Sequence, residues 1–233
     1  MLQLWLQPFA ATSNTTPLRV VLLAGQSNAE GQALTYRTDG SPGTLDHVLQ
    51  TNAAAAVTFG AWTPMSRDAS GRPAWPSRDD VYVYFDSEWG LQYGQLTAGF
   101  GAYNDLLHFG LEMEVGRLLG DHYSDPLLIV KVAYGDKSLK VDFRPPSAGG
   151  DASPGAYYTR LIDNYRAALA RIGTAFPALT PSLEGVIWWQ GFNDFCCGTR
   201  ALWFSNFCAC ARVQRCPGFS AMCALHAPVR TNR

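Results

Sequence analysis

The first 195 residues contain no cysteine, and the last 38 contain all six in the chain. Acidic residues show the opposite gap, because none of the nineteen lies beyond position 194. Residues 1–194 contain thirteen basic residues beside these nineteen acidic ones, whereas the rest of the chain has five arginines and no acidic side chain. So abrupt a change predicts that 196–233 is a Cys/Arg-rich tail of different origin, from a shifted reading frame, a retained intron or a truncated gene copy.

The chain also lacks a large charge of either sign, since its formal net charge is −1. It therefore has no electrostatic footprint for nucleic acid or for an anionic membrane surface. Its apolar runs are far shorter than the roughly 20 residues of a membrane-spanning helix, so no span is predicted. The G-x-G-x-x-G fingerprint of dinucleotide-binding folds is absent after the first apolar run.

Residues 1–17 are interpreted as an N-terminal extension. Their leucine-rich stretch resembles the core of a signal peptide, but no basic residue precedes it and glutamines interrupt it. The sequence 14–16, Asn-Thr-Thr, fits an N-glycosylation site. A secreted or lumenal location follows only if the extension is a signal remnant, and otherwise the compartment stays open.

The body, 18–195, is predicted to be one α/β domain, because 47% hydrophobic residues can bury a sizeable core. Short continuous apolar runs are typical of strands buried on both faces, and apolar residues at helical spacing indicate helices. Alternation of the two predicts a parallel sheet covered on both sides. The predicted strands are 18–24, 81–85, 127–133 and 185–190, the predicted helices are 111–119 and 156–176, and 32–80 is predicted to be mostly loop.

Three polar turns follow predicted strands, at 25–28, 134–138 and 190–194. Ligands of parallel sheets bind beyond the carboxyl ends of the strands, so these turns are the candidate site. Ser27 offers a hydroxyl and its own N–H, Gly135 allows close approach of a backbone N–H, and Gln190 adds an amide. Converging donors beside a nucleophile form an oxyanion hole, in which each donor contributes about 3 kcal/mol to acyl transfer.

Four segments carry a family resemblance in this order along the chain. GQSNAEG at 25–31 resembles the GQSN signature of SGNH hydrolases that include the sialate O-acetylesterase domain, carbohydrate esterase family 6. FGLEMEVGRLL at 109–119 resembles that family's FGPE-type helix start, with Leu111 in place of proline. KVAYGDKSL at 131–139, followed by FRPP, resembles its strand ending in a GG-x-SL turn, and WWQGFND at 188–194 resembles its W-x-QG-x-x-D block.

The resemblance implies a three-layer α/β/α, flavodoxin-like SGNH fold and a serine esterase that removes acetyl groups from carbohydrates, with no metal and no organic cofactor. It implies Ser27 as the nucleophile, Gln190 as the side-chain donor of the oxyanion hole, and an N–H at Gly135 or Asp136 as a further donor. Asp136 replaces the family's second glycine. The residues expected around the substrate are Gln26, Asn28, Lys137, Asn193 and Asp194, with Asn193 a rival donor.

A serine nucleophile needs a base, usually histidine, oriented by an acid. The family takes both from a D-x-x-H block near its C-terminus, and no such block follows 185–190 here. The string at 105–108 has the spacing but precedes the 111–119 helix, so it is expected to be a chance match. The last strand and helix of the fold are expected to be missing. A catalytically dead sugar-binding relic is therefore the alternative. The tail cysteines are expected to be unstructured thiols, with disulfides, or a small zinc module that includes His226, as the alternatives.

Overall fold

The computed structural model of the chain describes residues 16–148 and 154–196. The N-terminal extension up to residue 15 and all but the first residue of the Cys/Arg-rich tail lie outside the described residues. The predictions of a signal remnant, a glycosylation site, a missing last strand and helix, and a role for the tail cysteines therefore fall outside them as well. No helix in the described part is both long and apolar enough to cross a membrane.

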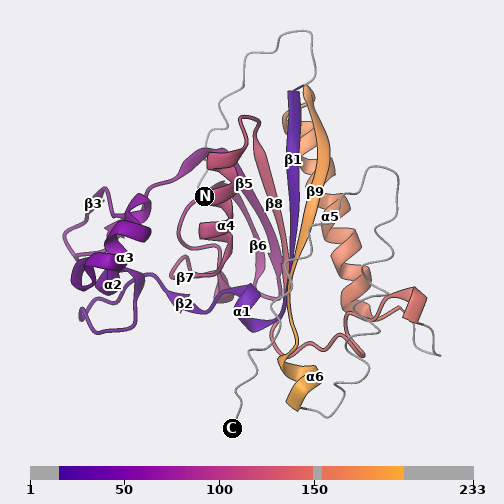
Figure 1. Cartoon of the computed structure of the whole chain (residues 1–233), viewed down its shortest axis with the longest axis horizontal. Helices are drawn as coiled ribbons and strands as arrows, with labels where there is room; N and C mark the ends of the chain where they lie inside the picture. Colours follow the sequence, from indigo (N-terminus) through magenta and orange to yellow (C-terminus); the bar gives the residue numbers. More distant parts are fainter. Residues whose placement is uncertain (1–15, 149–153, 197–233) are drawn as a thin grey trace.

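A five-stranded sheet forms the centre of the molecule, in the order β6-β5-β8-β1-β9. The strands are β1 (Thr16–Gly25), β5 (Arg78–Ser87), β6 (Gly90–Leu96), β8 (Leu127–Ala133) and β9 (Leu179–Trp189). β1 pairs in parallel with β8 and β9, and β8 pairs in parallel with β5. The carboxyl ends of these four strands consequently lie at one edge of the sheet, the lower edge in Figure 1.

Helices cover both faces of this sheet, α4 (Glu112–His122) on one side and α5 (Ala156–Ala175) on the other (Figure 1). Successive side chains of β1 point to opposite faces. Val20 and Leu22 belong to the buried cluster that contacts α5, whereas Val21 and Leu23 belong to the cluster on the α4 side. Every residue of β8 is buried, as expected for a central strand covered on both faces.

The predicted mixed α/β fold with a mostly parallel central sheet is confirmed. All four predicted strands are present, and each extends to at least its predicted bounds except at the end of β9. The predicted helix stripe of 156–176 is the face of α5 that packs on the sheet, since Tyr158 and Leu161 are buried and Ile162, Tyr165, Leu169 and Ile172 are partly buried against the same cluster.

One strand of the central sheet was not predicted. β6 runs antiparallel to β5 and is joined to it by a two-residue turn, Glu88–Trp89, because Ser87 pairs with Gly90. The apolar run that predicted 81–85 ends there, but the strand continues to Ser87 because the hairpin supplies hydrogen-bond partners that a sequence pattern does not reveal. The turn lies at the carboxyl end of β5, and therefore at the same edge as the predicted site.

The segment 32–80, predicted as loop, contains two short helices, α2 (Leu45–Thr51) and α3 (Ala53–Thr58). Thr44 and Asn52 cap them by accepting hydrogen bonds from the N–H groups of His47 and Ala55. The remaining elements are α1 (Ser27–Glu30), β2 (Ala33–Leu34), η1 (Gly60–Trp62), β3 (Ser66–Arg67), β4 (Pro73–Ala74), η2 (Ala102–Asn104), β7 (His108–Phe109), η3 (Pro146–Ala148) and α6 (Phe192–Cys196).

Candidate active site

Ser27 is the first residue of α1 and lies directly past the end of β1. Its side chain is half-buried, and Asn28 beside it is exposed. Gly25 brings β1 so close to β9 that an added Cβ would lie 2.1 Å from the carbonyl oxygen of Trp189. Glycine is therefore required at this position, and it fixes the place from which the serine turn begins.

The Gln26 side chain joins the serine turn to the turn after β9. Its amide donates to Oδ1 of Asn193 at 2.9 Å, and its carbonyl oxygen accepts from the N–H groups of Gly191 and Asn193 at 3.3 and 3.4 Å. Gln26 is buried. Two of the residues predicted to bind substrate thus hold each other, and they set the distance between the two turns.

Gln190 and Asp194 are also brought together. The Gln190 amide donates to the Lys137 carbonyl at 3.1 Å and to the Asp194 carboxylate. Asp194 is fully buried and accepts from the N–H groups of Leu139 and Lys140 at 2.8 and 3.0 Å. The buried carboxylate therefore ties the turn after β8 to the turn after β9.

Replacing Asp194 by asparagine is expected to lower the free energy of unfolding by about 3 kcal/mol, because an amide cannot accept from all of these donors and leaves a buried N–H unsatisfied. Urea denaturation measures this change. Asp163→Asn is the matched control, because the Asp163 side chain is exposed on the outer face of α5. It should change the free energy of unfolding by less than about 0.5 kcal/mol. Equal effects of the two substitutions would show that Asp194 does not hold the turns.

The turn after β8 places Gly135 and Asp136 next to this pair of turns. Asp136 is exposed and has a φ of 56°, in the left-handed region that favours glycine and tolerates aspartate. Lys137 follows, with its ammonium nitrogen 3.8 Å from Oε1 of Glu88 and 4.8 Å from the centre of the Tyr157 ring. Burial acts to lower the pKa of Lys137, but Tyr157 and the nearby carboxylates outweigh it and raise that pKa.

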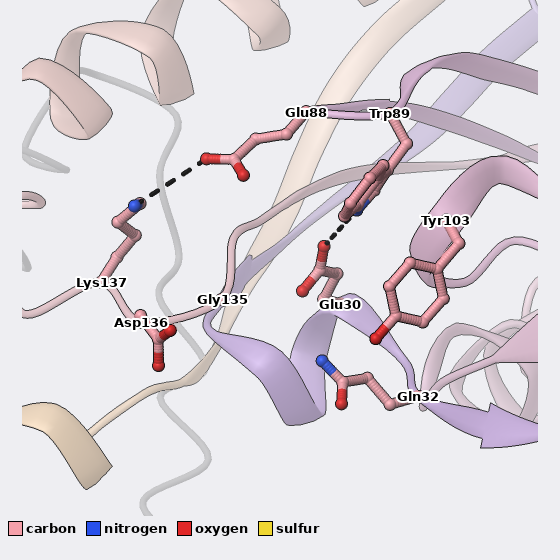
Figure 2. A pocket seen from close by; sticks show the side chains of 8 residues that line it. All are labelled: Glu30, Gln32, Glu88, Trp89, Tyr103, Gly135, Asp136 and Lys137. Atoms are coloured by element: carbon pink, nitrogen blue, oxygen red, sulfur yellow. Dashed lines mark hydrogen bonds and ion pairs between the residues drawn. The ribbon is translucent and has the colours of Figure 1, made fainter.

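An open pocket with a volume of about 220 Å³ lies at the same edge, beside α1 (Figure 2). The turn after β8 supplies three of its lining residues, Gly135, Asp136 and Lys137, and all three were predicted for the site. The other walls come from the end of α1, the β5–β6 turn and η2. Their residues are Glu30, Gln32, Glu88, Trp89 and Tyr103. Among these residues, Trp89 is the one that the sequence already marks, as a loop tryptophan that could stack on a sugar face or cover the edge of the core.

Two aromatic rings form one wall of the pocket. Trp89 and Tyr103 lie with ring centres 5.1 Å apart, and about half of each side chain is exposed. Tyr103, Asn104 and Leu106 all have positive φ, a concentration of backbone strain that is typical of functional loops. Asn104 also donates to the Trp89 carbonyl at 3.3 Å, which holds the loop against the β5–β6 turn.

Glu30 is the buried carboxylate of the pocket, with 4% of its surface exposed. Its Oε1 accepts from the indole N–H of Trp89 at 3.3 Å. Burial raises the pKa of Glu30, repulsion by Glu88 adds to that rise, and Trp89 and Lys131 oppose it. Sequence reasoning missed this residue because it read the acid only as part of the GQSNAEG motif.

The raised pKa of Glu30 has a consequence for stability. Its favourable contribution is complete below the ordinary glutamate pKa of about 4.3 and is lost as the pH rises through the raised value. Glu30→Gln is therefore expected to gain stability relative to the native chain as the pH rises from about 4 to about 8. Urea denaturation at several pH values measures this gain, and a difference that does not vary with pH would contradict it.

Beneath α1 lies a fully buried ion pair. Lys131 of β8 contacts Glu112 of α4 at 2.7 Å and donates to the backbone carbonyls of Glu30 and Phe100 at 2.7 and 2.6 Å. Burial lowers the pKa of Lys131, and Glu112 opposes that effect. The pair fastens the end of α1, and with it the position of Glu30, to both the sheet and α4.

The string at 105–108 forms an actual pair. Nδ1 of His108 lies 2.8 Å from Oδ2 of Asp105, and the imidazole contacts the Tyr103 ring edge-on at 4.9 Å. Burial acts to raise the pKa of Asp105, but His108 and the N–H of Leu107 outweigh it and lower that pKa. The pair borders the aromatic wall of the pocket.

Neither a protein-family model nor a curated protein matches the chain. Several solved structures are similar to it, including the two that follow. A protein from Arabidopsis thaliana is 13% identical with a TM-score of 0.42, over 76% of this chain and 59% of that one. A carbohydrate acetylesterase from Xanthomonas citri is 16% identical with a TM-score of 0.40, over 83% of this chain and 37% of that one. The chain thus spans less than two thirds of either protein, and at such TM-scores neither match bears on what this chain does.

Proposed function

We propose that the chain is a serine ester hydrolase of the SGNH type, related to sialate O-acetylesterases, that removes acetyl groups from carbohydrates. The observation that carries the proposal is the position of Ser27. It is a half-buried serine in a tight turn past β1, an interior strand of the sheet, at the edge where the turns after β5, β8 and β9 also lie. Such a turn presents both a hydroxyl and an N–H to one substrate atom.

In the proposed reaction the Ser27 hydroxyl attacks the ester carbonyl, forming an acyl-enzyme and releasing the alcohol. The oxyanion is stabilised by the Ser27 N–H and by an N–H of the Gly135–Asp136 turn. Water then attacks the acyl group and releases acetate and the free serine. The Gln190 amide is the third proposed donor, and it would have to exchange its bond to the Lys137 carbonyl for one to the oxyanion.

A second function, binding of an acetylated sugar without turnover, is favoured by these same Gln190 contacts. An amide that already donates to Asp194 and to Lys137 fits a structural link better than a catalytic donor. The deciding experiment is hydrolysis of 4-nitrophenyl acetate by the purified chain, beside its Ser27→Ala variant. Hydrolysis that depends on Ser27 supports the esterase, and hydrolysis by neither protein above the uncatalysed rate supports binding without turnover.

A further inference from the structure

The pocket beside α1 has an uneven charge. Three carboxylates line it, those of Glu30, Glu88 and Asp136, and one ammonium group, that of Lys137. The ammonium group is itself paired with Glu88 and lies over the Tyr157 ring. An anionic ligand would therefore meet net repulsion, whereas a cation would meet an excess of negative charge.

The aromatic wall adds a second, independent preference. Figure 2 shows the rings of Trp89 and Tyr103 next to each other, with the Glu30 carboxylate beside them and Asp136 and Lys137 across the pocket. Ring faces attract cations through their quadrupoles, and tryptophan does so most strongly. Rings combined with carboxylates are the surroundings in which proteins bind ammonium groups that carry carbon substituents.

The alternative of a metal cation does not fit. No group of three or more His, Cys, Asp and Glu side chains within residues 16–148 and 154–196 is placed to hold a metal ion. The carboxylates lie around the pocket and do not converge on one point.

The pocket has a volume of about 220 Å³. This is below the roughly 300 to 1,000 Å³ of pockets for drug-sized ligands, and it suits a single small group.

We propose that this pocket binds an ammonium group carried by the alcohol part of the ester, as in an O-acetylated amino sugar. The inference rests on the proposed function for the ester, but the binding of the cation does not require turnover. The ammonium group lies between the Trp89 and Tyr103 rings and the Glu30 and Glu88 carboxylates. A sugar that carries a carboxylate, such as a sialic acid, is rejected by the same groups.

Binding is tested first, on the Ser27→Ala variant, with choline and its neutral isostere 3,3-dimethylbutanol as probes. Choline is expected to bind about tenfold more tightly, as measured by calorimetry or by NMR titration. Glu88→Gln and Trp89→Leu should each reduce that ratio by at least about threefold. Asp163→Asn removes a carboxylate on α5 and should leave the ratio unchanged. Equal binding of the two probes, or equal effects of Glu88→Gln and Asp163→Asn, would overturn the inference.

Turnover is tested next, on the unaltered chain, with acetylcholine and 3,3-dimethylbutyl acetate. A kcat/KM about tenfold higher for the cationic ester is the expected result. Preferential binding of choline without any hydrolysis would contradict the proposed function but support binding of an ammonium group. Hydrolysis of both esters at equal kcat/KM would support the proposed function but contradict binding of an ammonium group.

Discussion

Replacing Lys131 by methionine is expected to lower the free energy of unfolding by about 3 to 5 kcal/mol, the usual result of removing one partner of a buried ion pair. The side chain is fully buried, so its loss leaves the Glu112 carboxylate without its cation. It also leaves the carbonyls of Glu30 and Phe100 without their donor. The free energy of unfolding of a native protein is only about 5 to 15 kcal/mol, so the variant should be close to unfolding at 37 °C.

Urea denaturation followed by circular dichroism measures the effect, with Glu112→Gln as the companion variant. Glu112→Gln should also destabilise the fold, since the amide oxygen can still accept from Lys131 but the amide nitrogen cannot accept from the Gly110 N–H. The double variant, Lys131→Met with Glu112→Leu, should recover part of the loss because no charge is then left buried. It should not recover all of it, because the two carbonyls remain without a donor. The single variant Glu112→Leu completes the cycle, and a double variant that loses as much stability as Lys131→Met and Glu112→Leu together would contradict the pairing.

Replacing Ser27 by alanine is expected to reduce hydrolysis of a small acetyl ester by about a thousandfold or more, as removal of a nucleophile does in serine hydrolases. The change removes one hydroxyl from a half-buried position at the start of α1, so the fold should be retained. Initial rates with 4-nitrophenyl acetate measure the loss, and burst kinetics measure the acyl-enzyme. Urea denaturation of the same sample verifies the fold.

Ser182→Ala is the matched control, because Ser182 is exposed on β9 and lies toward the amino end of that strand. Its rate should equal that of the native chain. Should Ser27→Ala keep the native rate, any hydrolysis would come from another group and the proposed nucleophile would be wrong. Should hydrolysis depend on Ser27, His108→Gln would next show whether the Asp105–His108 pair supplies the base.

The main strands could be predicted because continuous apolar runs such as LLIVKVA leave few alternatives to a buried strand. The same run concealed Lys131, whose charge is compatible with the core only because Glu112 and two carbonyls surround it. That partner set joins residues from four separate segments, and no local pattern reveals it. β6 was missed for a similar reason, since its glycine-containing sequence depends on pairing with β5.

The three turns past β1, β8 and β9 could be predicted from the rule that ligands bind at the carboxyl ends of parallel strands. The same rule applies to β5, and it would have added Glu88 to the site, next to the loop tryptophan Trp89, had that strand been extended to Ser87. Tyr103 could not have been found in this way. Its place on the pocket wall depends on several residues with positive φ. Tyrosine and leucine rarely adopt that conformation, so the sequence does not predict it.

Asp136 contributes both a backbone conformation and a charge to the site, and glycine at this position would supply only the first. It holds a conformation in which glycine is more comfortable, and it adds a carboxylate to the wall of the pocket. Replacing Asp136 by glycine would therefore remove a negative charge from the pocket at the same time as it relaxes the backbone of the turn. Asparagine also tolerates positive φ but carries no charge. Asp136→Asn would therefore remove the charge and keep the shape of the turn.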